Sequence, residues 1–435
     1  MEDKQSFKHI VKMAVLKPAY IKLRQYFPDF ADHIRLSIYG MHGNIGMNGG
    51  DSIEKADYKR PSGILVDLTQ ISRTNPKTGI QRVVNNVFQN MLIIEPSTLG
   101  VRDWQGKLIT SNKYIANIED EKFNGKEQEV ISKKGDILLL LDSSWEFSQD
   151  FTKILDDIHK NNGRSYSVVY DFFPVQYPEL FVDAYFREVF IKWHRMVLEK
   201  CDGLICISKT TADVVARYFQ TEKIVRNNKL NLYYFPMGFD LKSGETAERE
   251  EIRRFVEQAP TFLMVGTVEP RKGHMVAMQA LKKLVARNCV VQLLIIGKDG
   301  WKNDEIKLAF EDEQIKDKVK WVKDATDAEL QWCYEHCNAL IAASKDEGYG
   351  LPLIEAANYN LSIICSDIPV FREVAGINAT YFYAMDSDNL AVTIQTWLQE
   401  GKHPNSSGIK INTWKDSAQT ILDILAEKTE PYKIV

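Results

Sequence analysis

The most constraining feature of the sequence is a strand–turn–helix–strand pattern between residues 339 and 374. Short apolar runs at residues 339–343 and 361–365 predict two buried strands. A polar turn with two glycines follows the first run, and Leu351-Pro352 then opens a helical pattern, where proline is favoured because its missing N–H costs nothing. This order of elements builds parallel sheets covered by helices, so it predicts an α/β fold.

The residues around the start of that helix indicate a ligand-binding site. Gly348 and Gly350 let the backbone approach a ligand, and a helix N-terminus favours an anion such as a phosphate. Glu347 and Glu355 are eight positions apart, a little over two helical turns, so both carboxylates can lie on one side. Carboxylates accept hydrogen bonds from sugar hydroxyls. The spacing alone leaves open the alternative that both are solvated charges near the ends of a helix.

A basic loop follows another predicted strand, at residues 261–266. It reads Thr267-Val-Glu-Pro-Arg271-Lys272-Gly-His. Two adjacent cations at the carboxyl end of a strand suit a diphosphate, since arginine gives a planar fork and lysine a point charge. The alternative is a basic surface turn, which becomes the weaker interpretation once the glycine turn and Glu355 are considered together with it.

These motifs resemble the nucleotide-sugar site of the retaining glycosyltransferases of family 4. The resemblance is carried by the E-x7-E motif from Glu347 to Glu355, by the segment Cys365-Ser-Asp-Ile-Pro-Val-Phe-Arg-Glu-Val, and by the Glu-Pro-Arg-Lys loop. It implies the GT-B fold, in which two doubly wound Rossmann-like domains face each other across a cleft. It also implies kinship with mannosyltransferase-like enzymes of bacterial surface polysaccharide synthesis.

The resemblance assigns roles to residues of both halves. Arg271 and Lys272 are expected to bind the donor diphosphate, Glu355 the ribose hydroxyls and Glu347 the sugar ring. Many relatives place the arginine directly after the strand's glycine, where Thr267 stands here. The expected donor-binding residues are Gly79, Gly266, Arg271, Lys272, Gly348, Tyr349, Gly350, Leu351 and Glu355. The expected catalytic residues are Arg271, Lys272, Glu347 and Asp171.

In the first half, Gly79 ends a polar loop after the strand at residues 63–69 and precedes a helix that carries Arg82. A glycine and a cation at a helix start can face a phosphate or an acceptor. Family members often have two or more glycines in this loop, whereas this chain has one, so an ordinary loop is the alternative. Asp171 follows the predicted strand at 166–170 and is expected to orient a hydroxyl, or alternatively to cap a turn. Many relatives have His-Asp where this chain has Tyr170-Asp171.

The expected activity is retaining transfer of a hexose, with mannose as the first candidate. The donor would be a nucleotide diphosphate sugar such as GDP-mannose, and the acceptor a glycan or lipid-linked glycan. We expect no metal and no further cofactor. A GT-B nucleotide-sugar epimerase and a non-catalytic partner subunit remain as alternatives, although no acid–base cluster for epimerisation is evident. No Gly-x-Gly-x-x-Gly follows an early strand, which disfavours a dinucleotide enzyme.

The chain of 435 residues is long enough for two or three domains. Further strands are predicted at 137–141, 203–207, 231–235, 291–297 and 319–322. The expected domains are 1–60, a basic amphipathic extension and linker; 61–240, the acceptor-side Rossmann-like domain; 241–260, an inter-domain linker; 261–410, the nucleotide-sugar domain; and 411–435, a helix that crosses back to the first domain.

Composition limits the partners and the compartment. The net charge of −4 disfavours nucleic acid, and six scattered cysteines suit a reducing compartment. Cys333, His336 and Cys337 share a helical face, for which a partly buried helix is preferred over a metal site. Basic and apolar residues alternate over residues 1–30, which indicates either peripheral contact with an anionic membrane or a helix packed on the main body. We expect a cytoplasmic protein, at the inner face of the membrane in the first of these cases.

Overall fold

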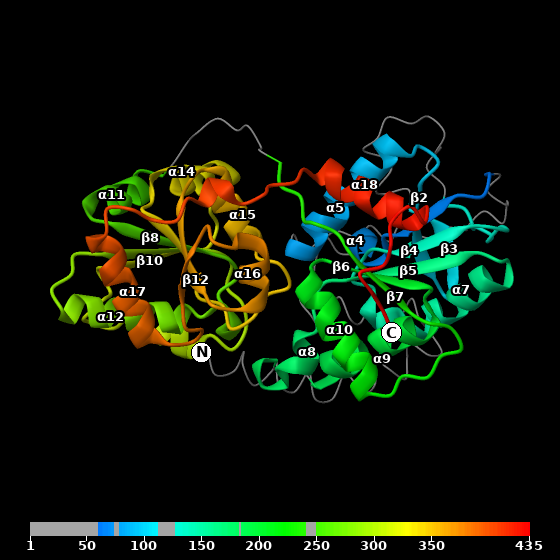
Figure 1. Ribbon diagram of the computed structural model, residues 1–435, viewed down its shortest axis with the longest axis horizontal. Coiled ribbons are helices and arrows are strands. Elements are labelled where there is room, and N and C mark those ends of the chain that lie inside the picture. The colour runs from blue at the N-terminus through cyan, green and yellow to red at the C-terminus, as the bar shows by residue number, and fades with distance from the viewer. Residues whose placement is uncertain (1–59, 74–77, 112–126, 182–183, 241–248) are drawn as a thin grey trace, which may run out of the picture.

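The structure, a computed structural model, describes residues 60–73, 78–111, 127–181, 184–240 and 249–435. It has two lobes, each built around its own sheet (Figure 1). The extension was expected at residues 1–60, of which residues 1–59 lie outside the described residues, and so does the membrane contact predicted for residues 1–30.

The first lobe contains an eight-stranded sheet in the order β14-β7-β6-β5-β4-β1-β2-β3. Its strands are β1 (Ile64–Asp67), β2 (Leu99–Trp104), β3 (Lys107–Thr110), β4 (Ile137–Leu140), β5 (Arg164–Val169), β6 (Gly203–Cys206), β7 (Asn231–Tyr234) and β14 (Lys433–Ile434). The neighbours from β7 to β2 pair in parallel, whereas β3 and β14 are antiparallel to their neighbours.

The apolar runs predicted β1, β4, β5, β6 and β7, but they did not predict β2, β3 or β14. The sheet is therefore mixed at its edges rather than parallel throughout. The antiparallel pair arises at Gln105 and Gly106, whose φ angles of 54° and 80° are those of a tight two-residue hairpin turn. Charged residues within β2, such as Arg102 and Asp103, hide this strand from a search for apolar runs.

Helices cover both faces of the first sheet. They are α4 (Thr69–Arg73), α5 (Gly79–Ile94), α7 (Ser148–Lys160), α8 (Phe173–Gln176), α9 (Ala184–Lys200), α10 (Lys209–Thr221) and α18 (Trp414–Leu425), with 3-10 turns η2 (Trp145–Phe147) and η3 (Pro178–Leu180). One apolar core lies under α7, α9 and α10. The other lies under α5 and α18, where Trp414 is almost fully buried.

The second lobe contains a six-stranded parallel sheet in the order β10-β9-β8-β11-β12-β13. Its strands are β8 (Thr261–Val265), β9 (Gln292–Ile296), β10 (Val319–Val322), β11 (Ala339–Ala342), β12 (Ser362–Ser366) and β13 (Thr380–Phe382). Its helices are α11 (Glu250–Gln258), α12 (His274–Ala286), α13 (Asp304–Phe310), α14 (Asp327–His336), α15 (Leu351–Asn358), α16 (Pro369–Ala375) and α17 (Ser387–Gln399), with 3-10 turns η4 (Pro270–Lys272) and η5 (Ser406–Gly408). Apolar cores fill both faces of this sheet as well.

Near the boundary between the lobes, the described residues 238–239 run beside residues 412–414. The N–H of Phe239 donates to the carbonyl of Asn412 at 2.8 Å, and Gly238 pairs with Asn412 as an isolated bridge. A Cβ at Gly238 would lie 2.5 Å from the backbone nitrogen of Trp414, so only glycine allows this approach. Beyond the crossing, α18 packs in the first lobe, as Figure 1 shows in red.

Part of the segment expected to be a linker is helical and packs in the second lobe. Ile252 and Val256 of α11 are buried in one of its cores. Arg249, which precedes this helix, pairs with Glu329 at 2.6 Å. Residues 241–248 lie outside the described residues.

The Cys/His cluster considered above lies at the end of α14, with Cys337 as the residue that caps the helix. Cys333 and Cys337 are buried in the apolar core of the second lobe, and the ring of His336 stacks on Trp332 with centroids 4.2 Å apart. Among the described residues, no helix combines the length and the apolar character needed to cross a membrane.

Candidate active site

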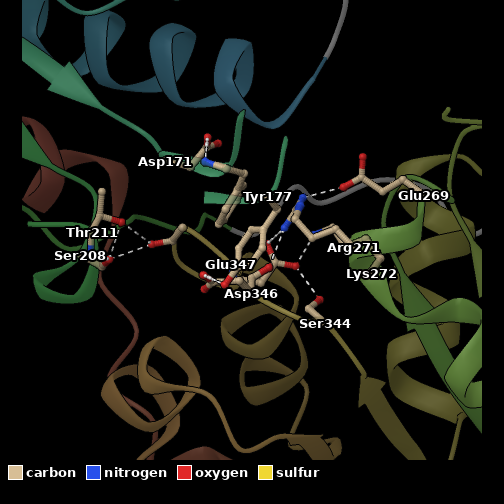
Figure 2. Close-up of polar contacts among 12 residues, drawn as sticks. Asp171, Tyr177, Ser208, Thr211, Glu269, Arg271, Lys272, Ser344, Asp346 and Glu347 are labelled. Atoms are coloured by element: carbon tan, nitrogen blue, oxygen red, sulfur yellow. Dashed lines mark hydrogen bonds and ion pairs between the residues drawn. The ribbon is translucent and has the colours of Figure 1, made fainter. Parts of the chain in front are cut away.

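The loop between β8 and α12 holds two cations against one carboxylate. Nη1 of Arg271 lies 2.9 Å from Oε2 of Glu347, and Nζ of Lys272 lies 2.5 Å from Oε1 of the same carboxylate. Ser344 donates its hydroxyl to Glu347 at 2.7 Å, and Nη2 of Arg271 reaches Glu269 at 2.6 Å. Figure 2 shows Arg271, Lys272 and Ser344 converging on Glu347.

Glycines give this loop its path. Gly273 has a φ of 71°, and a Cβ there would lie 2.0 Å from the carbonyl oxygen of Ala343 at the end of β11. Gly266 has a φ of 141°, and a Cβ there would lie 3.5 Å from the Lys272 side chain. The turn is therefore pressed against the neighbouring strand, which brings both cations to the carboxyl edge of the sheet.

The electrostatics keep this cluster ionised. Burial alone would raise the pKa of Glu347, but the charges of Arg271 and Lys272 outweigh it and lower the pKa to about 2. Burial would also lower the pKa of Arg271, yet the carboxylates of Glu347 and Glu269 raise it. Lys272 has three donors and arginine has five, so both retain donors beyond those that Glu347 accepts.

A pocket adjoins Lys272 at the start of α15. Gly350 precedes the helix with a φ of 106°, and a Cβ there would lie 2.8 Å from the ring of Phe371. The pocket is lined by Met264, Val265, Lys272, His274, Ile341, Ala342, Ala343, Ser344, Glu347, Gly350, Pro352, Leu353 and Phe371. A helix N-terminus and a lysine thus face one space, an arrangement that favours an anion.

The turn at residues 348–351 also contacts the first lobe. The carbonyl of Gly348 accepts hydrogen bonds from the hydroxyls of Ser208 at 2.8 Å and Thr211 at 3.2 Å (Figure 2). A Cβ at Gly348 would lie 2.4 Å from the carbonyl oxygen of Tyr170. Tyr349 and Leu351 pack against cores of both lobes. Gly348 therefore permits the close approach of the two lobes.

Glu355, on the second turn of α15, is 5% exposed and has partners on both of its oxygens. Tyr334 donates its hydroxyl to Oε2 at 2.7 Å, and Nη1 of Arg82 lies 2.6 Å from Oε1. Arg82 comes from α5 in the first lobe, and its partner had not been predicted. No sequence signal pointed to the hydroxyl contact of Tyr334.

The segment after β5 brings the first lobe over the cations. The guanidinium carbon of Arg271 lies 4.5 Å from the ring centroid of Phe173. The hydroxyl of Tyr177 donates a hydrogen bond to Asp346 at 3.0 Å. Asp171 is partly buried and accepts the N–H of Phe173 at 3.3 Å, the turn contact considered from the sequence. Burial raises the pKa of Asp171 to about 6, and Arg271 opposes that shift.

Gly79 is the first residue of α5, and a Cβ there would meet open space. Its helix is nevertheless the one that delivers Arg82 to Glu355. The expected site residues thus fall into three groups: a cation cluster around Glu347, a carboxylate clamp at Glu355, and contributions from the first lobe at Asp171 and α5.

Comparison with known families identifies the second half of the chain. Residues 245–414 match the family model of glycosyl transferases group 1.

These residues form a group 1 glycosyltransferase domain. The chain is 32% identical over 380 residues to the serotype-specific mannosyltransferase WbdA of Escherichia coli, a match that covers 82% of this chain and 46% of WbdA. It is 27% identical over 214 residues to the O-antigen chain mannosyltransferase RfbU of Salmonella typhimurium, covering 49% of this chain and 55% of RfbU. The chain spans about half the length of these curated relatives.

Solved structures share the fold of most of the chain. Sucrose-phosphate synthase from Thermosynechococcus elongatus has a TM-score of 0.55 at 14% identity, over 85% of this chain and 99% of that one. Anabaena HepE in complex with UDP and glucose has a TM-score of 0.53 at 13% identity, and the match covers 83% of this chain and 94% of HepE. The glycosyltransferase domain therefore forms one lobe of a GT-B fold, which confirms the expected fold class.

Proposed function

We propose that the chain transfers a hexose from a nucleotide diphosphate sugar to a glycan or lipid-linked glycan in bacterial surface polysaccharide synthesis, with retention of anomeric configuration. The observation that carries this proposal is that Lys272, Glu347 and the N-terminus of α15 line one pocket, while Arg271 pairs with the same Glu347 carboxylate. The mannosyltransferases among its relatives support mannose as the sugar and GDP-mannose as the first donor to test.

The chemistry follows from where charge develops. As the bond between the anomeric carbon and the phosphate breaks, negative charge builds on the leaving diphosphate. Arg271 and Lys272, already fixed in the folded site, would stabilise that charge without reorganising. Glu347 would hold hydroxyls of the sugar ring and Glu355 those of the ribose.

The remaining step is activation of the acceptor. In the proposed mechanism the leaving phosphate takes the acceptor's proton on the same face of the sugar, so that neither a metal ion nor another cofactor takes part. Asp171, with a pKa of about 6, is mostly ionised at neutral pH and can accept a hydrogen bond from an acceptor hydroxyl. Its electrostatic interaction with Arg271 supports this role, because Arg271 is the residue that we assign to the leaving diphosphate.

The test begins with a donor screen. Thermal shift measurements with GDP-mannose, UDP-glucose and related sugar nucleotides would identify the donor. Mass spectrometry would then show the added hexose, and proton NMR the anomeric configuration of the product. The proposal expects an α-linked product from an α-linked donor and full activity in EDTA. Inversion, loss of activity with the chelator, or an epimerised sugar nucleotide formed without acceptor would overturn it.

A further inference from the structure

Glu355 is held from both lobes at once. Its side chain is 6% exposed, and its ion pair with Arg82 joins residues 273 positions apart. On the other oxygen it accepts the hydroxyl of Tyr334, which is 2% exposed and stacks on Tyr359 with centroids 5.6 Å apart. The carboxylate therefore has a defined orientation, set by one rigid partner in its own lobe and one cation from the other lobe.

This arrangement leaves hydrogen-bonding capacity for a diol. An ionised carboxylate has about four acceptor positions, two on each oxygen. Arg82 and Tyr334 occupy one position on each oxygen. One acceptor per oxygen remains, which matches the two neighbouring hydroxyls of a ribose.

The buried carboxylate of Glu355 also needs the positive charge of Arg82. A buried carboxylate without a cation is strongly disfavoured, and removing one partner of a buried pair costs more than the pair itself contributes. The side chain of Arg82 is 38% exposed and its guanidinium lies 5.8 Å from the ring centroid of Phe239, beside the crossing between the lobes. Arg82 thus contacts Glu355 from the seam between the lobes and remains partly exposed.

We propose that Arg82 is a positioning residue that orients Glu355 toward the ribose diol of the donor, so that recognition of the nucleotide depends on contact between the lobes. This inference rests on the proposed function, because it takes Glu355 as the residue that binds ribose. It adds a first-lobe residue to donor recognition.

Contacts elsewhere along the seam support the dependence on lobe contact. Glu373 of α16 accepts the N–H groups of Lys209 and Thr210, both at 2.8 Å, at the start of α10. Ser208 and Thr211 bind the carbonyl of Gly348. The same face of the first lobe therefore fixes both the glycine turn and, through Arg82, the carboxylate on the helix that follows it.

The experiment compares a ribonucleotide with its dideoxy analogue. Calorimetry would measure the affinities of GDP and 2′,3′-dideoxy-GDP, or of the UDP pair if UDP binds better, for the wild-type chain and for Arg82→Met, Arg82→Lys and Glu355→Gln. We expect Arg82→Met and Glu355→Gln to weaken ribonucleotide binding by at least about tenfold, and the dideoxy analogue by less than about twofold. Arg82→Lys should retain part of the ribonucleotide affinity that Arg82→Met loses. The double variant Arg82→Met/Glu355→Gln should bind the ribonucleotide no more weakly than Glu355→Gln alone.

A matched control separates positioning from general damage. Arg164 pairs with Glu427, and its side chain is 34% exposed, close to the value for Arg82. Arg164→Met should leave both affinities unchanged. Equal weakening of both nucleotides by Arg82→Met, or none, would overturn the inference while the Glu355→Gln result still supports the proposed function. Failure of the wild-type chain to bind either ribonucleotide would overturn both.

Discussion

Nη1 of Arg271 and Oε2 of Glu347 lie 2.9 Å apart, although the two residues sit on loops after different strands, β8 and β11. Lys272 contacts the other oxygen of the same carboxylate. The parallel sheet explains the meeting, because β8 and β11 are neighbours and their carboxyl ends share one edge. The two cations that we assign to the diphosphate are thus held in position by the carboxylate of Glu347 from the adjacent loop.

The first prediction concerns Lys272. Lys272→Ala should lower kcat by about 100- to 1,000-fold, because one preorganised donor to the leaving phosphate is worth about 3–4 kcal/mol. Lys282→Ala is the control, since Lys282 pairs with Asp312 on the surface of the same lobe. Steady-state rates with the identified donor provide the measurement. Wild-type rates in Lys272→Ala would contradict the role of the cation.

The second prediction concerns Glu347 and acid. Its pKa is about 2 in the folded chain, and its ordinary value is 4.5. The stability from this ion cluster is therefore fully present above pH 4.5 and is lost as the pH falls toward 2. Glu347→Gln should cost roughly 3 kcal/mol of unfolding free energy at pH 7 and much less near pH 3. Urea denaturation at the two pH values measures this, and a difference independent of pH would refute it.

The third prediction concerns Asp67 and Asp142, a buried acidic pair at the ends of β1 and β4. Burial, with the charge of Asp142, raises the pKa of Asp67 to about 7, and burial raises that of Asp142 to about 6. Because the folded chain binds these protons more tightly than the unfolded chain, this pair's stabilising contribution is greatest below pH 3.8 and is lost as the pH rises to about 7.

Asp67→Asn tests the acidic pair with a nearly isosteric neutral group. The decrease in melting temperature between pH 5 and pH 8 should be smaller in the variant than in the wild-type chain. Asp150→Asn, on the first turn of α7, serves as a reference away from this pair. Identical slopes in the wild-type chain and in Asp67→Asn would show that the pair does not hold its proton as described.

The fourth prediction concerns the glycine turn. Gly348→Ala would place a Cβ 2.4 Å from the carbonyl of Tyr170, so the lobes must separate slightly or the turn must shift. We expect a loss of stability of about 1–3 kcal/mol together with weaker donor binding. Gly401→Ala is the control, because a Cβ there meets open space. Differential scanning calorimetry and donor titration would detect the effect, and a variant that matches Gly401→Ala in both would contradict it.

The sequence predicted those parts of the fold in which one local signal dominates. Apolar runs marked β5, β6 and β8, and Leu351-Pro352 marked the start of α15. The hairpin of β2 and β3 was missed because its strands carry charges and its turn depends on a positive φ at Gln105, a residue that rarely adopts it.

The candidate site likewise contains residues that local motifs predicted and contacts that depend on the packing of the two lobes. Arg271, Lys272, Glu347 and Glu355 were chosen from local motifs, and the structure brings the first three into contact. The contact of Arg82 with Glu355 joins two lobes and depends on how those lobes pack, which no local pattern encodes.

The position of Phe173 under Arg271 has the same origin. The sequence marked Asp171 at the end of β5, but the path of the following segment across the seam is a tertiary property. Contacts between the lobes cannot be predicted from local sequence patterns, and the structure therefore adds residues such as Phe173 to the candidate site.

The central claim is that Arg271, Lys272 and the start of α15 bind the diphosphate of a sugar nucleotide. A crystal structure of the chain with the donor identified in the screen tests it most directly. We predict phosphate oxygens within about 3 Å of both Lys272 Nζ and the Arg271 guanidinium, with the ribose hydroxyls on Glu355. A sugar nucleotide bound elsewhere, with its phosphates away from both cations, would contradict the account.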